Sequence, residues 1–154
     1  MAEAVAATLH DGGVAVDVRP ARDVRNSLVG WDVVVVGAPI HSGRWHTDAH
    51  RFLKRHRGEL RQMPVVVFGI GPRGGTEEAW RRFRSQLDRA LAKRDWLAPA
   101  ATTVFGGVDP PKRAEQARRD LRDWDAIRAW ATDIPRLLPP AAPAAPAPSA
   151  GTGA

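Results

Sequence analysis

The sequence predicts an α/β fold, a doubly wound parallel sheet with helices on both faces, and two kinds of pattern support this prediction. Residues 32–38 (DVVVVGA) and 64–70 (PVVVFGI) are continuous β-branched runs, typical of parallel strands buried on both faces. The segments that follow these runs show the 3.6-residue apolar period of amphipathic helices. Strands separated by helices form right-handed βαβ units, so we expect helices to cover both faces of the sheet.

The chain opens with a helix predicted over residues 2–10, which Gly12 and Gly13 end. Residues 14–18 (VAVDV) alternate apolar and polar side chains, which predicts a half-buried strand. After the run at 32–38, five residues at helical spacing predict one buried helix face: Trp45, Ala49, Phe52, Leu53 and His56.

A longer helix is predicted from Thr76, because an acidic first turn suits the positive end of a helix dipole. Its inward face comprises Ala79, Trp80, Phe83, Leu87 and Leu91. Residues 102–107 (TTVFGG) predict a last short strand, and residues 123–138 contain the final helix. The predicted buried stripe of that helix is Trp124, Ile127, Trp130 or Ala131, and Ile134.

Length and composition indicate one domain over residues 1–138, N-terminally incomplete, followed by a tail over 139–154. The tail contains only Pro, Ala, Gly, Ser and Thr, so we expect it to be disordered. The chain has no cysteine, no apolar run near the roughly 20 residues of a membrane span and no basic leader segment. These features predict a cytoplasmic protein without a membrane span or a disulfide framework.

The formal net charge is +6, from 20 Arg and 3 Lys against 17 acidic residues. The arginines are spread from Arg19 to Arg136 rather than gathered, so the sequence favours a solvated surface and no nucleic-acid partner. His46 and His50 lie four apart, a spacing that can bind a metal, but no third ligand is placed by sequence and no metal site is predicted. No Gly-x-Ser-x-Gly motif is present, which disfavours hydrolase chemistry.

Two loops should meet where ligands of such sheets bind, beyond the carboxyl ends of the strands. Residues 39–45 (PIHSGRW) follow the first buried run, and residues 69–76 (GIGPRGGT) follow the second. Ser42 offers a hydroxyl and Arg44 a cation, while glycines let backbone N–H groups approach a ligand closely. Trp45 could stack on a flat ring or begin the buried helix face. This combination suits a flavin better than a bare phosphate.

Three segments together resemble the flavodoxin-domain proteins, in the branch that includes the quinone-dependent protoporphyrinogen oxidases. They are residues 33–60 (VVVVGAPIHSGRWHTDAHRFLKRHRGEL), 104–110 (VFGGVDP) and 122–131 (RDWDAIRAWA). The resemblance implies a flavodoxin-like fold with its first strand absent, and FMN as cofactor. It also implies flavin-dependent oxidoreductase chemistry with a quinone or porphyrin as reaction partner. Carried over by position, the implied flavin contacts are Pro39, Ile40, His41, Ser42, Gly43, Arg44, Trp45, Gly69, Gly71, Pro72 and Gly75.

The sequence departs from this family at its N-terminus. The usual first strand and the Ser/Thr/Gly-rich loop that holds the FMN phosphate are both absent, and the missing strand would lie between residues 14–18 and 32–38. Three explanations stay open: the natural start lies upstream, the two flanking strands pair directly, or the protein is a relative without a cofactor. The last predicts a flavodoxin-fold module without enzymatic activity.

Charge supports one further expectation about the flavin. Arg44 and Arg73 lie in the two flavin-side loops, and nearby cations stabilise a negatively charged reduced flavin. We therefore expect a higher reduction potential than that of acidic electron carriers.

Overall fold

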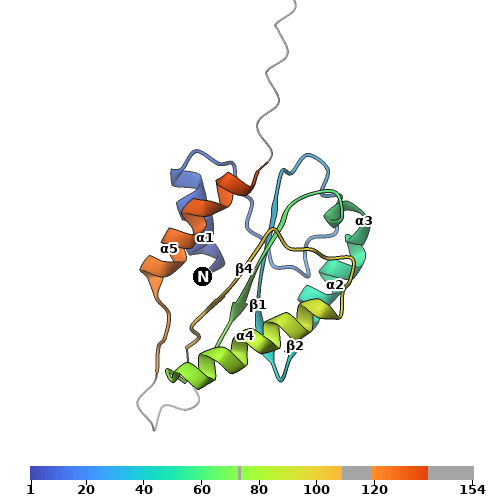
Figure 1. Ribbon diagram of the computed structural model, residues 1–154. Coiled ribbons are helices and arrows are strands. Elements are labelled where there is room, and N and C mark those ends of the chain that lie inside the picture. The colour runs from blue at the N-terminus through green and yellow to red at the C-terminus, as the bar shows by residue number, and fades with distance from the viewer. Residues whose placement is uncertain (73, 109–118, 139–154) are drawn as a thin grey trace, which may run out of the picture.

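The computed structural model describes residues 1–72, 74–108 and 119–138, so the predicted tail lies outside the described residues. A central sheet separates two layers of helices (Figure 1). One layer holds α1 (Ala2–Asp11) and α5 (Trp124–Asp133), which pack against each other. The other layer holds α2 (Thr47–Arg55), α3 (Arg57–Leu60) and α4 (Glu77–Ala92). A 3₁₀ helix, η2, extends α5 over Ile134–Leu137.

The sheet has the strand order β2-β1-β3-β4. Strands β1 (Val34–His41), β3 (Val65–Ile70) and β4 (Ala101–Phe105) are parallel, and β2 (Arg44–Trp45) pairs antiparallel with the end of β1. This mostly parallel sheet between two helical layers confirms the predicted fold class. Within the described residues, no helix is both long and apolar enough to cross a bilayer.

Strand β3 is buried on both faces, as its β-branched run predicts. Val65 and Val67 belong to the core between the sheet and α2, α3 and α4, whereas Val66 and Phe68 belong to the core beside α1 and α5. All four side chains are at most 1% exposed. Because successive side chains of a strand point to opposite faces, β3 contributes to the cores on both sides of the sheet.

The predicted helices form close to the expected positions. The buried face predicted after the first run is confirmed, since Trp45, Ala49, Phe52, Leu53 and His56 are each at most 5% exposed. Thr76 caps α4, because its Oγ1 accepts a hydrogen bond of 3.2 Å from the Ala79 N–H.

The prediction that Trp124 lies in the core is wrong. Its side chain is 36% exposed at the first position of α5, with the Arg122 guanidinium 5.0 Å from the ring centroid. The buried stripe begins one turn later, at Ile127, Ala131 and Ile134.

The predicted strand over residues 14–18 does not form. No described segment pairs with it, and its Val16 and Val18 side chains are 37% and 47% exposed. A strand is stable only when a neighbour satisfies its backbone groups, so the apolar alternation alone does not produce one. Direct pairing of residues 14–18 with β1, one of the three explanations for the missing first strand, therefore does not occur.

Candidate functional site

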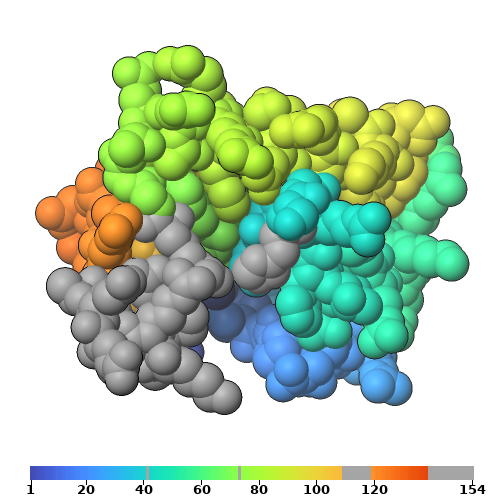
Figure 2. Space-filling model, turned by 90° about the horizontal axis from the view of Figure 1, so that it is seen from below, coloured from blue at the N-terminus to red at the C-terminus, as the bar shows by residue number. Residues whose placement is uncertain are grey.

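Three loops assemble at the carboxyl ends of the parallel strands. The loops after β3 and β4 bond to each other, because the Gly71 N–H donates to the Phe105 carbonyl at 2.9 Å and the Gly107 N–H donates to the Pro72 carbonyl at 3.1 Å. The loop after β1 is tied to α4, since the Gly43 N–H donates to Gln86 Oε1 at 3.2 Å. Figure 2 shows this side of the molecule, with residues near 40–60 (cyan) beside α4 (yellow-green).

The loop after β1 is a tight hairpin turn. Ser42 and Gly43 have φ angles of 51° and 71°, which reverse the chain within two residues and start β2 at Arg44. Ser42 and Arg44 are exposed, and neither side chain has a hydrogen-bond or ion-pair partner among the residues that the structure describes. The turn thus leaves a hydroxyl and a guanidinium available to a ligand.

Several other predicted flavin contacts lie in the protein interior. Ile40 and Trp45 are 5% and 3% exposed, so Trp45 begins the buried helix face. Gly69 and Gly71 are also buried, and a Cβ added at Gly71 would lie 2.3 Å from Phe83 Cε2. Both glycines therefore permit close packing against the Phe83 ring.

The remaining predicted contacts differ in exposure. Gly75 is exposed with room for a Cβ, and Pro39, Gly43 and Pro72 are half-buried. The side chain of His41 and the whole of Arg73 lie outside what the structure describes. That these loops contact a flavin stays a prediction.

The two histidines with metal-binding spacing have other partners. His46 caps α2, with its Nδ1 accepting a 3.3 Å bond from the Asp48 N–H, and His50 Nδ1 contacts Arg94 Nη2. Burial, followed by the charges of Arg94 and Lys93, lowers the pKa of His50, so its neutral ring accepts from Arg94. The described residues contain no group of three His, Cys, Asp or Glu that could hold a metal.

A polar cluster that the sequence did not predict holds the segment before β1. Glu59 Oε1 accepts from Ser27 Oγ at 2.5 Å and from the Leu28 N–H at 2.7 Å, and its Oε2 lies 2.9 Å from His56 Nδ1. His56 Nε2 in turn lies 3.2 Å from the Val24 carbonyl. These bonds from Ser27, His56 and Leu28 lower the pKa of Glu59 to about 2. The only sequence signal was a histidine on an apolar helix face, which requires a polar partner without identifying it.

The exposed groups fit one half of a flavin nucleotide. Ser42, Arg44 and the backbone around Gly75 offer a hydroxyl, a cation and N–H groups to the polar edge of a flat ring. For the phosphate, the described residues contain no Ser/Thr/Gly-rich loop before a helix of the α1 and α5 layer. Glu3 in the first turn of α1 would repel a phosphate there. The ring half therefore fits these exposed groups, whereas α1 does not favour the phosphate half.

The comparison with protein families agrees with this architecture. A family model described as a flavodoxin domain matches residues 1–122, which include every described strand. A search of curated proteins found no match. Because the family model covers well over half of the chain and the sheet has the expected parallel order, the chain belongs to the flavodoxin-domain family.

Proposed function

We propose that this chain is an FMN-binding redox protein, an oxidoreductase related in activity to the quinone-dependent protoporphyrinogen oxidases. The observation that carries the proposal is the hairpin turn after β1 at the carboxyl edge, where Ser42 and Arg44 are exposed and have no partner among the described residues. In doubly wound folds, ligands bind at this edge. The family match supports a flavin as the ligand.

In this proposal the flavin supplies the electron-transfer chemistry, and the protein supplies binding and electrostatics. Ser42 donates a hydrogen bond to the ring edge, and Arg44 places a positive charge beside it. This charge favours the reduced, negatively charged cofactor and attracts an anionic partner such as a porphyrin with propionates. A quinone would serve as electron acceptor.

A second function has an observation of its own. Glu3 lies in the first turn of α1 and would repel a phosphate at that end of the helix, which favours a flavodoxin-fold module that works without a cofactor. The two proposals differ in one measurable property, the affinity for flavin.

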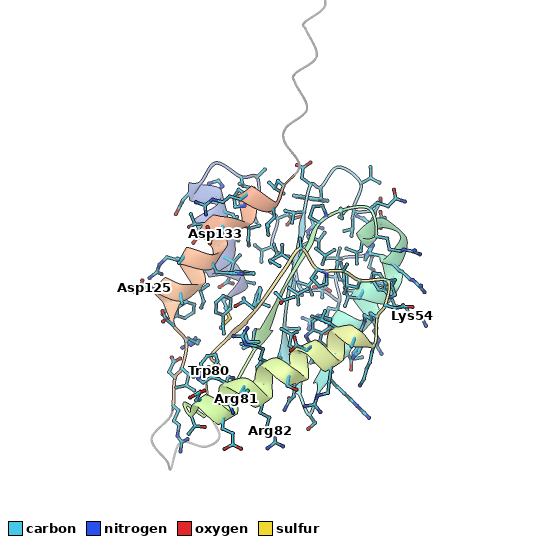
Figure 3. The ribbon with its side chains drawn as sticks, viewed as in Figure 1. Lys54, Trp80, Arg81, Arg82, Asp125 and Asp133 are labelled. Atoms are coloured by element: carbon cyan, nitrogen blue, oxygen red, sulfur yellow. The ribbon has the colours of Figure 1, made fainter. Side chains whose placement is uncertain are left out.

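The test is a titration of FMN, and of riboflavin beside it, into the purified chain, followed by flavin fluorescence. We expect both to bind, with affinities within about fivefold of each other, because in this proposal the protein holds the ring and not the phosphate. Ser42→Ala and Arg44→Ala should each weaken binding, whereas Lys54→Ala should not. Lys54 is exposed on the outer side of α2 and serves as the matched control (Figure 3).

Absence of binding by both flavins would reject the redox proposal and support the cofactor-free module. Binding that Arg44→Ala and Lys54→Ala weaken equally would place the flavin elsewhere on the molecule.

A further inference from the structure

The segment formed by β2 and α2 is joined to α4 at two points. The Gly43 N–H, just before β2, donates to Gln86 Oε1 of α4 at 3.2 Å. Further along the chain, Nη2 of Arg94, just beyond the C-terminal end of α4, contacts His50 Nδ1 of α2. The side of α4 that carries Gln86 therefore faces β2 and α2, and Figure 2 shows the two segments (cyan and yellow-green) next to each other.

Five cations lie along this boundary, and together they form the basic strip: Arg82, Arg89, Lys93, Arg94 and Lys54. The first three lie four residues before Gln86 or three and seven residues after it, so they share its side of the helix. Lys54 lies one helical turn after His50, on the same side of α2. Arg94 is half-buried and the other four are exposed. From the first arginine to the last, the strip covers about 18 Å at 1.5 Å per residue.

The protein leaves the charge of the basic strip uncompensated. None of its five cations forms an ion pair with a carboxylate of the described residues. Elsewhere in the described parts of the chain, six arginines do form ion pairs: Arg19, Arg22, Arg81, Arg122, Arg128 and Arg136. Figure 3 shows Lys54 and Arg82 on α2 and α4, and it shows Asp125 and Asp133 far from them on α5.

Acidic side chains do not interrupt the strip. Asp88 lies two residues after Gln86 and therefore on the far side of α4, because two residues turn a helix by about 200°. For the same reason Asp48, two residues before His50, lies on the far side of α2. Two further carboxylates are exposed near the ends of the strip: Glu78 and Asp95. Between these ends, the strip presents positive charge alone.

The surface around the strip favours a phosphate backbone over other anionic partners. All large hydrophobic side chains that are exposed among the described residues belong to other segments: Val16, Val18, Val29, Trp31 and Trp124. Protein–protein interfaces are anchored by apolar and aromatic side chains, and helices that lie on membranes insert an apolar face. Single-stranded nucleic acids stack their bases on exposed aromatic rings. A duplex needs none of these anchors, because arginine and lysine bind its phosphates from outside.

We propose that the basic strip binds the sugar–phosphate backbone of a double-stranded nucleic acid without reading its base sequence. The guanidinium groups donate paired N–H bonds to phosphate oxygens, and the lysines add point charges. In the sequence the arginines are spread along the chain, which favours a solvated surface, whereas folding gathers cations from α2 and α4 on one surface. The proposal does not depend on flavin binding, because Ser42 and Arg44 are not part of the strip.

The test uses the full chain and fluorescein-labelled DNA duplexes of about 20 base pairs with unrelated sequences, followed by fluorescence anisotropy at several salt concentrations. We expect all duplexes to bind with similar affinity. The logarithm of the binding constant should fall with the logarithm of the salt concentration with a slope of about −3 to −4.5, as for three to five phosphate contacts. One of the two strands alone should bind more weakly, because the strip offers no aromatic ring for stacking.

Two double variants separate the strip from the net charge. Arg82→Gln with Arg89→Gln removes two cations of the strip, so the slope should become shallower by about 2 and the affinity should fall at least about tenfold in dilute salt. Arg81→Gln with Arg128→Gln removes the same charge from two exposed arginines that are paired with carboxylates outside the strip. This second variant should keep the slope of the unchanged protein.

Several results would overturn the proposal. Absence of duplex binding in dilute salt, single-strand binding as tight as duplex binding, or an equal loss of affinity in the two double variants would each do so. Tighter binding, at equal phosphate concentration, to vesicles of equal parts phosphatidylcholine and phosphatidylserine would show that a membrane is the partner. Displacement of more than half of the duplex by poly-glutamate at equal charge concentration would show that the strip accepts acidic polypeptides instead.

Discussion

The carboxylate of Glu59 lies 2.9 Å from Nδ1 of the buried His56 and joins α3 to a segment more than thirty residues earlier in the chain. Both ring nitrogens of His56 face oxygen acceptors, Glu59 Oε2 and the Val24 carbonyl. The cluster therefore supplies tertiary contacts that the local sequence pattern does not encode.

The Glu59 cluster should make stability depend on acid pH. Its hydrogen bonds with Ser27, His56 and Leu28 lower the pKa of Glu59 from 4.5 to about 2. A lowered carboxyl pKa gives a stabilisation that is fully present above the unfolded value and is lost as the pH falls toward 2. Glu59→Gln should thus lower the urea midpoint at pH 7, and the difference from the unchanged protein should shrink below about pH 4.5.

The control for this variant is Glu77→Gln, which removes an ion pair with Arg81 on the exposed side of α4. Its effect should be small, because an exposed ion pair contributes little to stability. An equal loss in the two variants would contradict a specific role for the Glu59 cluster.

Gly37→Ala should destabilise the fold by about 1–3 kcal/mol through overpacking. A Cβ at this position would lie 1.9 Å from Phe68 Cζ, so the ring would have to leave its place among Phe105 and Trp130. Urea unfolding measures the loss. Combining the change with Phe68→Leu should recover part of it, because the shorter side chain leaves room for the methyl group.

Gly58→Ala is the matched change, because a Cβ there meets nothing within 4 Å. It lies in α3 and should leave the protein equally stable or slightly more stable. If both glycine variants lost the same stability, steric conflict with Phe68 would not be the cause.

Trp45→Phe should change the free energy of unfolding by less than about 1.5 kcal/mol, whereas Trp45→Ala should cost about 3–5 kcal/mol. The indole Nε1 is buried without a hydrogen-bond partner in the described structure, so phenylalanine loses ring volume but no bond. The Arg94 guanidinium, 5.4 Å from the ring centroid, retains an aromatic face in the first variant. A loss from Trp45→Phe as large as that from Trp45→Ala would reveal a bond made by the indole.

In the flavin-loaded protein, Arg44→Ala should lower the two-electron reduction potential by an amount on the order of tens of millivolts. The exposed guanidinium acts through a largely solvent dielectric, which limits the effect. Redox titration with dye indicators measures it, and Arg44→Lys should keep most of the original potential because it retains the charge. An unchanged potential in Arg44→Ala would place the guanidinium away from the ring.

The parallel sheet could be predicted from the sequence because the β-branched run of β3 by itself indicates a strand that is buried on both faces. Residues 14–18 carry an equally clear strand pattern and form none, since pairing depends on a neighbour that no local pattern encodes. The loops after β1 and β3 follow the carboxyl ends of their strands, as expected, and their binding of a ligand stays a prediction. Which of their residues are exposed could not be predicted. Ile40 and Gly71 are buried by contacts with distant segments. Ser42 and Arg44 project from a turn whose φ angles decide their direction.

The one-sided pairing of β1 has a consequence for how the folded chain opens. Amides of Val34 and Val36 are directed at β3, which has strand partners on both sides. Those of Val35 and Gly37 are directed at the opposite edge of β1, where β2 pairs only with Ile40 and His41. Neighbouring residues of a single strand should therefore exchange their amide protons on different timescales, slow at even positions and fast at odd ones. Exchange of the slow amides requires β1 to separate from β3. Exchange of the fast amides requires no separation of these two strands.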